Sequence, residues 1–401
     1  MPSYKVSDDE LIAAFNKFGG DVEQMAAALS MDRWGIRQRL KRMTEDGRLQ
    51  PDRTGQVPPP SAELKVAREK LKQLETQLLT DEFVARTILN MARTPANPPS
   101  WTLEAKKGKT DLTGVPTLFL SDWHWGEVVR PEEIGGVNEY NMTIAQSRAR
   151  TVISVAVDLL TNHLSSARYP GICLLLGGDM VSGDIHDELR ETNETATMPT
   201  WIDLLGTMKW VINELHQTFG KVFVVGVTGN HGRTTHKPRA KRRNHSNFDW
   251  LLYKVLERDY TDNRAVSFMI PEGPDALFRL YGHRYLLTHG DQFRGGDGII
   301  GPLGPITRGD IKKRSRQAQL NQGYDTLLMG HWHQLIQLDS LIVNGSLKGY
   351  DEYAAASNFK FENPRQALWI THPDLGITIQ MPVYAERRHR SETVEWVSVA
   401  S

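Results

Sequence analysis

The chain has 401 residues, of which 39% are hydrophobic and 24% are charged, a composition typical of globular proteins with one large domain and one or two small ones. Lysine plus arginine equals aspartate plus glutamate at 48 each, so the net charge indicates no partner, and a nucleic-acid site would have to be a local basic patch. The single cysteine, Cys173, excludes an intramolecular disulfide, and its apolar neighbours predict a core residue rather than a nucleophile. No apolar run approaches the roughly 18 residues of a membrane span, and the first residues lack the apolar segment of a signal peptide. We therefore expect a cytoplasmic protein without a membrane partner.

Residues 1–50 predict a small helical module. Ser7, with Glu10 three residues later, has the pattern of a capping box for a first helix. A second helix near Val22–Leu29 and a third that begins after Asp32 follow with the short spacing of a helix-turn-helix. We favour DNA binding for this module, and a helical oligomerisation or docking module is the alternative. The basic side chains that the third helix would present to a groove are Arg33, Arg37, Lys41 and Arg42.

Residues 51–114 predict a proline-containing linker and a helical segment. Within this segment, apolar residues repeat at alternating steps of three and four over about two heptads. This short coiled-coil pattern either pairs with a second chain, which would make a homo-oligomer through residues 61–92, or packs on the main domain. The repeated positions are Leu64, Ala67, Leu71, Leu74 and Leu78.

From Val115 to the end, short apolar runs alternate first with helical patterns and later with one another. A turn at Asp374-Leu375-Gly376 between two apolar runs predicts a hairpin. Strands crossed by helices, followed by hairpins, predict an α/β domain over residues 115–401, with two sheets packed as a sandwich and flanked by helices. The expected helices are 144–164, 201–218 and 248–259, and the expected strands include 221–228, 267–270, 276–281 and 284–288.

Five of the apolar runs end in residues that bind metals. Ligands of α/β proteins bind outside the carboxyl ends of the strands, so we expect these side chains to gather there, with Asp179 at the centre. Aspartate, asparagine and histidine suit hard or borderline divalent ions, and thiolates are absent from the set. Any one stretch is weak evidence, but five in order are specific. The five stretches are Ser121-Asp122-Trp123-His124, Gly177-Gly178-Asp179, Gly229-Asn230-His231, His289-Gly290-Asp291 and Gly330-His331-Trp332-His333.

This ordered set resembles the calcineurin-like metallophosphoesterase superfamily over roughly residues 115–345. The resemblance implies a two-metal phosphoesterase, in which a hydroxide held between two divalent ions attacks phosphorus in line. It further implies that one ion is held by three of the residues and the second ion by three others, with Asp179 bridging both. Manganese is the favoured metal, and iron, zinc, nickel and magnesium are alternatives. The implied ligands are Asp122, His124 and His333 for the first ion, and Asn230, His289 and His331 for the second.

The resemblance also implies a catalytic role for His231, which would face the phosphate and assist the leaving oxygen as a proton donor. The sequence departs from the family pattern at Gly232, where family members often have an acidic residue that orients this histidine. The orienting partner is therefore open. Asp184, His186 and Arg233 are the candidates for residues that support the site from behind the ligands.

Within the superfamily the chain looks most like SbcD-type DNA-repair exonucleases and phage-encoded metallophosphoesterases, because Asn344-Gly345-Ser346 follows the last motif as it does in those nucleases. Two basic clusters, expected on loops over the metal face, would hold a nucleic-acid backbone. We therefore predict a metal-dependent phosphodiesterase that acts on single- or double-stranded DNA, in a prokaryote or a phage-infected host. Only a short tail follows the last motif, so dependence on a partner ATPase is in doubt. The two clusters are Lys237, Arg239, Lys241, Arg242 and Arg243, and Lys312, Lys313 and Arg314.

Two alternatives stay open. A phosphomonoesterase or protein phosphatase would use the same ligands without needing the basic clusters or the helical module. A regulatory DNA-binding protein with a vestigial metal site is the non-enzyme alternative, and the complete ligand set argues against it. Exonuclease or endonuclease action, strand polarity, and DNA or RNA as substrate are not decided by the sequence.

Overall fold

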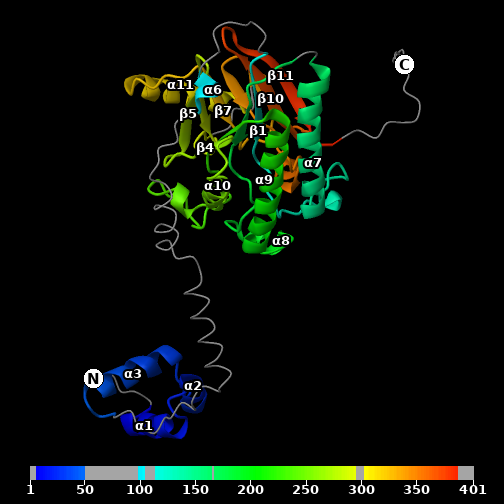
Figure 1. Cartoon of the computed structure of the whole chain (residues 1–401). Helices are drawn as coiled ribbons and strands as arrows, with labels where there is room; N and C mark the ends of the chain where they lie inside the picture. Colours follow the sequence, from blue (N-terminus) through cyan, green and yellow to red (C-terminus); the bar gives the residue numbers. More distant parts are fainter. Residues whose placement is uncertain (1–5, 50–97, 104–112, 165–166, 295–301, 387–401) are drawn as a thin grey trace. The chain divides into compact units, whose positions relative to one another are not determined.

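The computed structural model describes residues 6–49, 98–103, 113–164, 167–294 and 302–386 (Figure 1). The chain divides into two compact units, one up to residue 80 and one beyond it. The predicted coiled-coil pattern at residues 61–92 lies outside the described residues. Among the described residues, no helix combines the length and the apolar composition that a bilayer crossing requires.

The first unit contains three helices: α1 (Asp8–Lys17), α2 (Val22–Leu29) and α3 (Arg33–Glu45). The predicted capping box at the start of α1 is confirmed, since Ser7 and Glu10 bond to each other's backbone amides. Asp32 caps α3 as predicted, through the amide of Gly35. An apolar core between the helices, which includes Leu11, Met25 and Ile36, explains why these short helices hold together.

The first sheet of the second unit has the order β11-β10-β1-β2-β3-β4. Strands β1 to β4 run parallel, and β10 pairs antiparallel with both β1 and β11. Strands β1, β2 and β3 are buried along their whole length, which explains why they read as continuous apolar runs in the sequence. The strands are β1 (Val115–Leu120), β2 (Ile172–Leu176), β3 (Val222–Gly226), β4 (Val266–Met269), β10 (Arg365–His372) and β11 (Gly376–Tyr384).

The second sheet has the order β5-β6-β7-β9-β8. Its central strands β6, β7 and β9 are parallel, and antiparallel partners close both edges. The strands are β5 (Asp275–Leu280), β6 (His283–Thr288), β7 (Thr326–Met329), β8 (Ile336–Leu338) and β9 (Leu341–Val343).

The two sheets pack face to face. Because successive side chains of a strand point to opposite sides, one set fills the space between the sheets and the other set faces the helices. Phe119 and Leu175 share a buried cluster with Phe278 of the second sheet. Leu118 and Leu174, one residue earlier, belong to the cluster that includes side chains of the outer helices. Cys173 is buried in the cluster between the sheets, as predicted.

Helices cover both outer faces of this sandwich (Figure 1). Three long helices pack on the first sheet, and α11 packs on the second through residues such as Ile306. The predicted α/β sandwich of two sheets with flanking helices is therefore confirmed. The long helices are α7 (Met142–Asp158, continued as a π-helical turn at Leu159–His163), α9 (Thr197–Phe219), α10 (Phe248–Asp259) and α11 (Leu303–Gln319). The short helices are α6 (Ser100–Leu103), α8 (Asp187–Thr192), α12 (Glu352–Ala356), and the 3-10 turns Pro131–Glu133 and Asn244–Ser246.

Candidate metal centre

The carboxyl ends of β1, β2, β3, β6 and β7 meet at one edge of the sandwich, which we call the ligand edge. The loops that leave these strands carry the predicted ligands, and the structure brings their side chains together. Ligand atoms in each of three overlapping groups lie within 4.8 Å of one another. The groups are Asp122, His124 and His333; His124, Asp179 and His231; and Asp179, His289 and His331.

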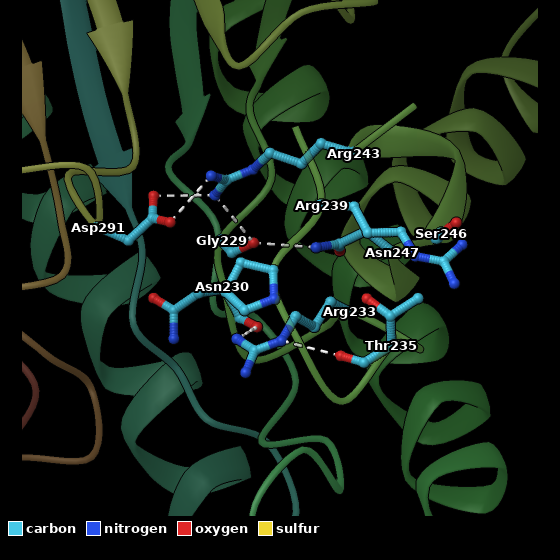
Figure 2. Close-up of a pocket in the computed structure, with 10 residues that line it drawn as sticks. Gly229, Asn230, Arg233, Thr235, Arg239, Arg243, Ser246, Asn247 and Asp291 are labelled. Carbon is cyan, nitrogen blue, oxygen red and sulfur yellow. Dashed lines mark hydrogen bonds and ion pairs between the residues drawn. The ribbon is translucent and has the colours of Figure 1, made fainter. Parts of the chain in front are cut away.

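The group around Asp179 and His289 also includes Asn230, which is drawn in Figure 2. Nε2 of His289 lies 2.9 Å from Oδ2 of Asp179 and 3.2 Å from Oδ1 of Asn230. Nδ1 of the same ring lies 2.8 Å from the carbonyl oxygen of Gly177, which can only accept a hydrogen bond, so Nδ1 carries a proton. Nε2 therefore faces two oxygen acceptors, an arrangement that requires a positive charge between them.

The pKa values of this group also indicate that positive charge is favoured between these side chains. Burial acts to lower the pKa of His289, but the negative charge of Asp179 and the hydrogen bond to it outweigh burial and raise that pKa to about 10. Burial alone would raise the pKa of Asp179, yet the neighbouring histidines hold it well below its ordinary value. The pocket formed by these side chains thus favours cationic charge. Its nitrogen and oxygen donors fit a hard or borderline divalent ion.

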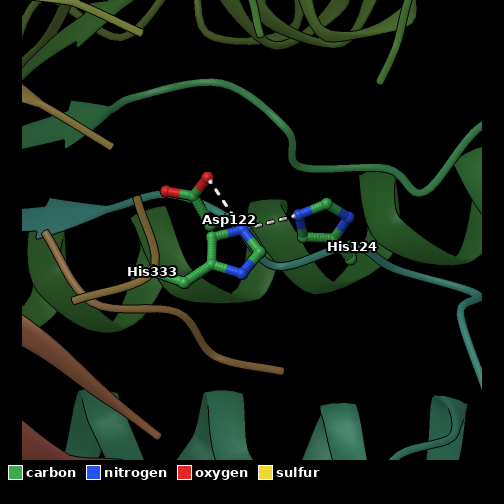
Figure 3. A group of neighbouring side chains, drawn as sticks. All are labelled: Asp122, His124 and His333. Carbon is green, nitrogen blue, oxygen red and sulfur yellow. Dashed lines mark hydrogen bonds and ion pairs between the residues drawn. The ribbon is translucent and has the colours of Figure 1, made fainter. Parts of the chain in front are cut away.

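Asp122, His124 and His333, drawn in Figure 3, form another of the three groups, which shares His124 with the group that contains Asp179. Nε2 of His333 is 3.4 Å from Oδ1 of Asp122 and 3.1 Å from Nε2 of His124. Nδ1 of His124 is 3.1 Å from the buried carboxylate of Glu127, which favours the proton on Nδ1 and leaves the lone pair of Nε2 directed at the group. Burial would raise the pKa of Glu127, but Lys348 at 2.7 Å outweighs burial and keeps that pKa well below its ordinary value.

The ligands sit in an unusual backbone conformation. Positive φ angles, which non-glycine residues rarely adopt, occur at five of the seven predicted ligands. Each such residue costs on the order of 1 kcal/mol or more, and such residues gather at functional sites. The five angles are 55° at Asp122, 47° at His124, 50° at Asp179, 68° at His331 and 52° at His333.

Close approach of the loops explains two glycines of the motifs. A Cβ atom on Gly229 would lie 2.0 Å from Oδ1 of Asp179, and one on Gly330 would lie 2.2 Å from Oδ2 of Asp122. No side chain fits at either position without displacing a carboxylate. These glycines therefore make room for the ligands of neighbouring loops.

A buried carboxylate that the sequence did not reveal holds two of the loops together. Asp249, in the first turn of α10, accepts hydrogen bonds from the amides of Asp179 at 3.0 Å, Met180 at 3.2 Å and Gly229 at 2.9 Å. Burial and the charge of Asp179 raise the pKa of Asp249 to about 7. No local motif marks Asp249 as part of a site, because its partners lie at the ends of β2 and β3.

A second network that the sequence did not reveal supports His124. Lys348 is fully enclosed between Glu127 and Asp351, with its Nζ 2.7 Å from Oε1 of Glu127 and 2.5 Å from Oδ2 of Asp351. The only local signal was Glu127, three residues after His124. Lys348 and Asp351 are distant from Glu127 in the sequence, and only the folded chain brings them to the site.

His231 lies between these groups. Its amide donates to Oδ1 of Asp179 at 2.7 Å, and its Nδ1 donates to the carbonyl oxygen of Ser182 at 3.1 Å. Ser182 therefore takes the orienting position that the sequence left open. Burial lowers the pKa of His231 to about 3, so the resting imidazole is neutral. An acid cannot stand at Gly232, because a Cβ there would lie 2.6 Å from Oδ1 of Asn247.

The three candidate supporting residues are placed differently from one another. Asp184 is exposed, and no bond from its side chain is found among the described residues. His186 is also exposed, with its ring centre 5.9 Å from that of His231. Arg233 is half-buried and donates to the backbone carbonyl oxygens of Asn230, Thr235 and His236.

The predicted basic clusters are only partly exposed. Lys237, Arg239, Lys241 and Arg242 are exposed, whereas Arg243 forms a bidentate ion pair with Asp291 at 2.8 and 2.9 Å. In the first unit, the four basic residues of α3 that were predicted to face a groove are exposed, whereas the fifth, Arg39, is buried; Arg33 is paired with Glu23 at 2.8 Å.

The second basic cluster requires a correction. Its residues belong to helix α11 and not to a loop. Lys313 is buried and bonds to Asp275 at 2.6 Å, so it is not available to a nucleic-acid backbone. Arg314 bonds to Asp310 at 2.8 Å and to backbone carbonyls, and of the three only Lys312 is exposed.

No protein-family model and no curated protein matches the chain. Solved structures of similar fold were found at low identity, among them the following three. A Vps29 single mutant from Entamoeba histolytica is 13% identical, with a TM-score of 0.29, over 67% of this chain and 99% of that one. A conserved uncharacterized protein from Streptococcus pneumoniae TIGR4, described as a predicted phosphoesterase, is 10% identical, with a TM-score of 0.26, over 68% and 99%. The sulfate thiohydrolase SoxB from Thermus thermophilus is 9% identical, with a TM-score of 0.28, over 70% and 57%. At these values we draw no conclusion about function from the likenesses.

Proposed function

We propose that the chain is a calcineurin-like metallophosphoesterase that hydrolyses phosphodiester bonds of nucleic acid, most simply DNA. The observation that carries the proposal is the convergence of nitrogen and oxygen donors at the ligand edge, with a buried carboxylate at the centre. Such a donor set is typical of two-metal phosphoesterases.

The residues divide into two ligand sets around a shared carboxylate. Asp122, His124 and His333 would hold one ion, and Asn230, His289 and His331 would hold the other. Asp179 belongs to groups on both sides, which supports its role as the bridge. When bound, two divalent ions, for which we favour manganese, lower the pKa of the attacking water and offset the charge that develops on the phosphoryl oxygens.

The surrounding side chains orient the ligands and manage protons. The carboxylate of Glu127 favours the proton of His124 on Nδ1, and the carbonyl oxygen of Gly177 accepts that of His289, so each ring would offer Nε2 as a ligand atom once an ion replaces any proton there. His231 is placed to serve the leaving oxygen. Because Nδ1 of the neutral ring donates to the carbonyl oxygen of Ser182, Nε2 must first take up a proton, which forms the imidazolium, before it can donate to the leaving oxygen.

Nucleic acid is the proposed substrate because exposed cations follow the site directly. Lys237, Arg239, Lys241 and Arg242 lie within eleven residues after His231 and are all exposed. On the first unit, α3 exposes Arg37 and its basic neighbours, and we propose that this helix contacts DNA phosphates. A phosphomonoesterase would need neither feature.

The test is a substrate panel with purified protein and manganese. We expect cleavage of linear or circular DNA and of bis(p-nitrophenyl) phosphate, with loss of activity on chelation and recovery on re-addition of metal. RNA and a nitrophenyl monoester are the comparison substrates. A preference for the monoester over every nucleic acid would show that the protein is a phosphatase and not a nuclease. Inactivity toward all of these substrates with metals bound would contradict the proposal that the protein is an enzyme.

A further inference from the structure

A narrow pocket of about 20 Å³ lies beside the ligand Asn230 and opens to solvent (Figure 2). Its wall includes three arginines, Arg233, Arg239 and Arg243, and one acidic residue, Asp291. None of the roles described above uses this pocket.

The charges in its wall do not cancel. Arg243 and Asp291 neutralise each other through two hydrogen bonds, drawn in Figure 2. Arg233 has no carboxylate within 4.0 Å in the described part of the chain, and Arg239 is exposed and likewise forms no ion pair there. Two guanidinium groups therefore carry charge that the described residues leave without a carboxylate partner.

The guanidinium of Arg233 is held in place by neutral groups. It donates to the carbonyl oxygens of Asn230 at 2.9 Å, Thr235 at 3.0 Å and His236 at 3.3 Å. These bonds fix its orientation without removing its charge, and two of its five N–H groups are not used by them. A guanidinium with fixed orientation and free donors is suited to a phosphate group, which it can bind with two parallel hydrogen bonds.

One residue, Asn230, belongs both to the wall of the pocket and to the metal centre. Asn230 lines the pocket, its carbonyl oxygen accepts from Arg233, and its side-chain oxygen lies 3.2 Å from Nε2 of His289. An anion bound by these arginines at the open mouth of the pocket would therefore lie next to the group that holds the second ion. In a nucleic-acid strand, the group next to the cleaved phosphodiester that carries a full negative charge is the neighbouring phosphate.

We propose that Arg233 and Arg239 form a subsite for a second phosphate of the strand, adjacent to the phosphodiester that is cleaved. This inference rests on the proposed function. It specifies the substrate class further, because an oligonucleotide with a flanking phosphate should be a better substrate than an isolated diester.

The experiment compares three dinucleotides: dithymidylate, its 5′-phosphorylated form and its 3′-phosphorylated form. Wild type should cleave one phosphorylated form with a kcat/KM at least tenfold higher than dithymidylate, because a hydrogen bond to a charged group contributes about that much. Arg233→Gln and Arg239→Gln should each lower this preference about tenfold, mainly through KM. Arg233→Lys, which keeps the charge, should retain part of it. The matched control is Arg264→Gln. Arg264 is exposed and lies just before β4, at the end of the sheet opposite to the ligand edge, so this variant should keep the wild-type preference.

A binding titration separates the subsite from the catalysis. With chelator present and no hydrolysis, wild type should bind the preferred phosphorylated dinucleotide more tightly than dithymidylate, and Arg239→Gln should lose the difference. Arg239 makes no hydrogen bond in the described structure, so its replacement should not disturb folding even if Arg233→Gln does. Equal binding of all three dinucleotides by wild type, or a preference that survives in Arg239→Gln, would overturn the subsite. Inorganic phosphate that competes with dithymidylate and its phosphorylated forms equally would show a site for free phosphate only, which also overturns it. Phosphate-dependent binding without hydrolysis of any substrate, the nitrophenyl diester included, would support the subsite and contradict the proposed function.

Discussion

Glu127→Gln tests whether the buried network behind His124 is needed for both stability and metal binding. The carboxylate of Glu127 has two partners, Lys348 at 2.7 Å and Nδ1 of His124 at 3.1 Å, and all three side chains are buried. Glutamine has nearly the same shape but only one side-chain oxygen. Its NH₂ group must therefore face either the ammonium of Lys348 or the N–H of His124, and each of these is a donor.

Two effects of this substitution can be estimated. Removing one partner of a buried ion pair typically destabilises a protein by about 3–5 kcal/mol, and because Asp351 still neutralises Lys348 we expect the lower end, about 3 kcal/mol. Loss of the carboxylate that orients a metal-binding histidine typically lowers metal affinity by about 10- to 100-fold. We expect a loss in this range for the ion held by Asp122, His124 and His333.

The assay combines urea unfolding of the metal-free protein with manganese titration. Glu133→Gln, an exposed glutamate on the same loop, is the control and should change neither quantity. The fold depresses the pKa of Glu127 from its ordinary value of 4.5, so its contribution to stability is fully present above that pH and is lost as the pH falls toward the depressed value. The stability difference between wild type and Glu127→Gln should therefore be constant above pH 5 and shrink in acid. A difference of under 0.5 kcal/mol at pH 7 together with unchanged manganese affinity would refute the reasoning; 0.5 kcal/mol is roughly the effect of an ordinary surface substitution.

Three further outcomes are expected. Asp179→Asn should abolish hydrolysis and lower the metal content while the far-ultraviolet circular dichroism stays native; wild-type turnover with two metals bound would remove Asp179 from the centre of the site. His231→Ala should keep both metals and lose about 100- to 10,000-fold in turnover, less for a diester with a nitrophenol leaving group, and an equal loss on good and poor leaving groups would argue against proton donation. Removal of residues 1–97 should preserve hydrolysis of the nitrophenyl diester, weaken DNA binding, and flatten the log–log salt dependence by about 0.9 for each lost phosphate contact. Unchanged DNA affinity and salt slope would instead make the N-terminal helices a docking or dimerisation module.

The sequence was sufficient where function and local structure coincide in a short stretch. Each ligand loop combines a buried strand, readable as an apolar run, with a ligand directly after it, so the gathering of Asp122 and Asp179 at one edge follows from the parallel order of β1 and β2, and the packing of the second sheet adds His289. Ser7 and Asp32 were readable as helix caps for the same reason, since the cap and its partner are three residues apart.

The sequence did not predict contacts between residues that are distant along the chain, or the burial of charged residues on the inner face of a helix. Lys348 and Glu127 are 221 positions apart, and no local pattern joins them. The basic run around Lys313 suggested an exposed loop, but in helix α11 every third or fourth residue faces the sheet, and Lys313 and Gln317 are both buried. What stabilises Lys313 there is Asp275, on a strand that the run itself does not reveal.

The left-handed backbone of the ligand loops has an evolutionary consequence. At His124 and His333, glycine would relieve a conformation that histidine adopts only at a cost, while removing a ligand. Selection for stability and selection for catalysis therefore act in opposite directions at the same codons. A chain that no longer needed the activity would gain stability by replacing these ligands with glycine or asparagine.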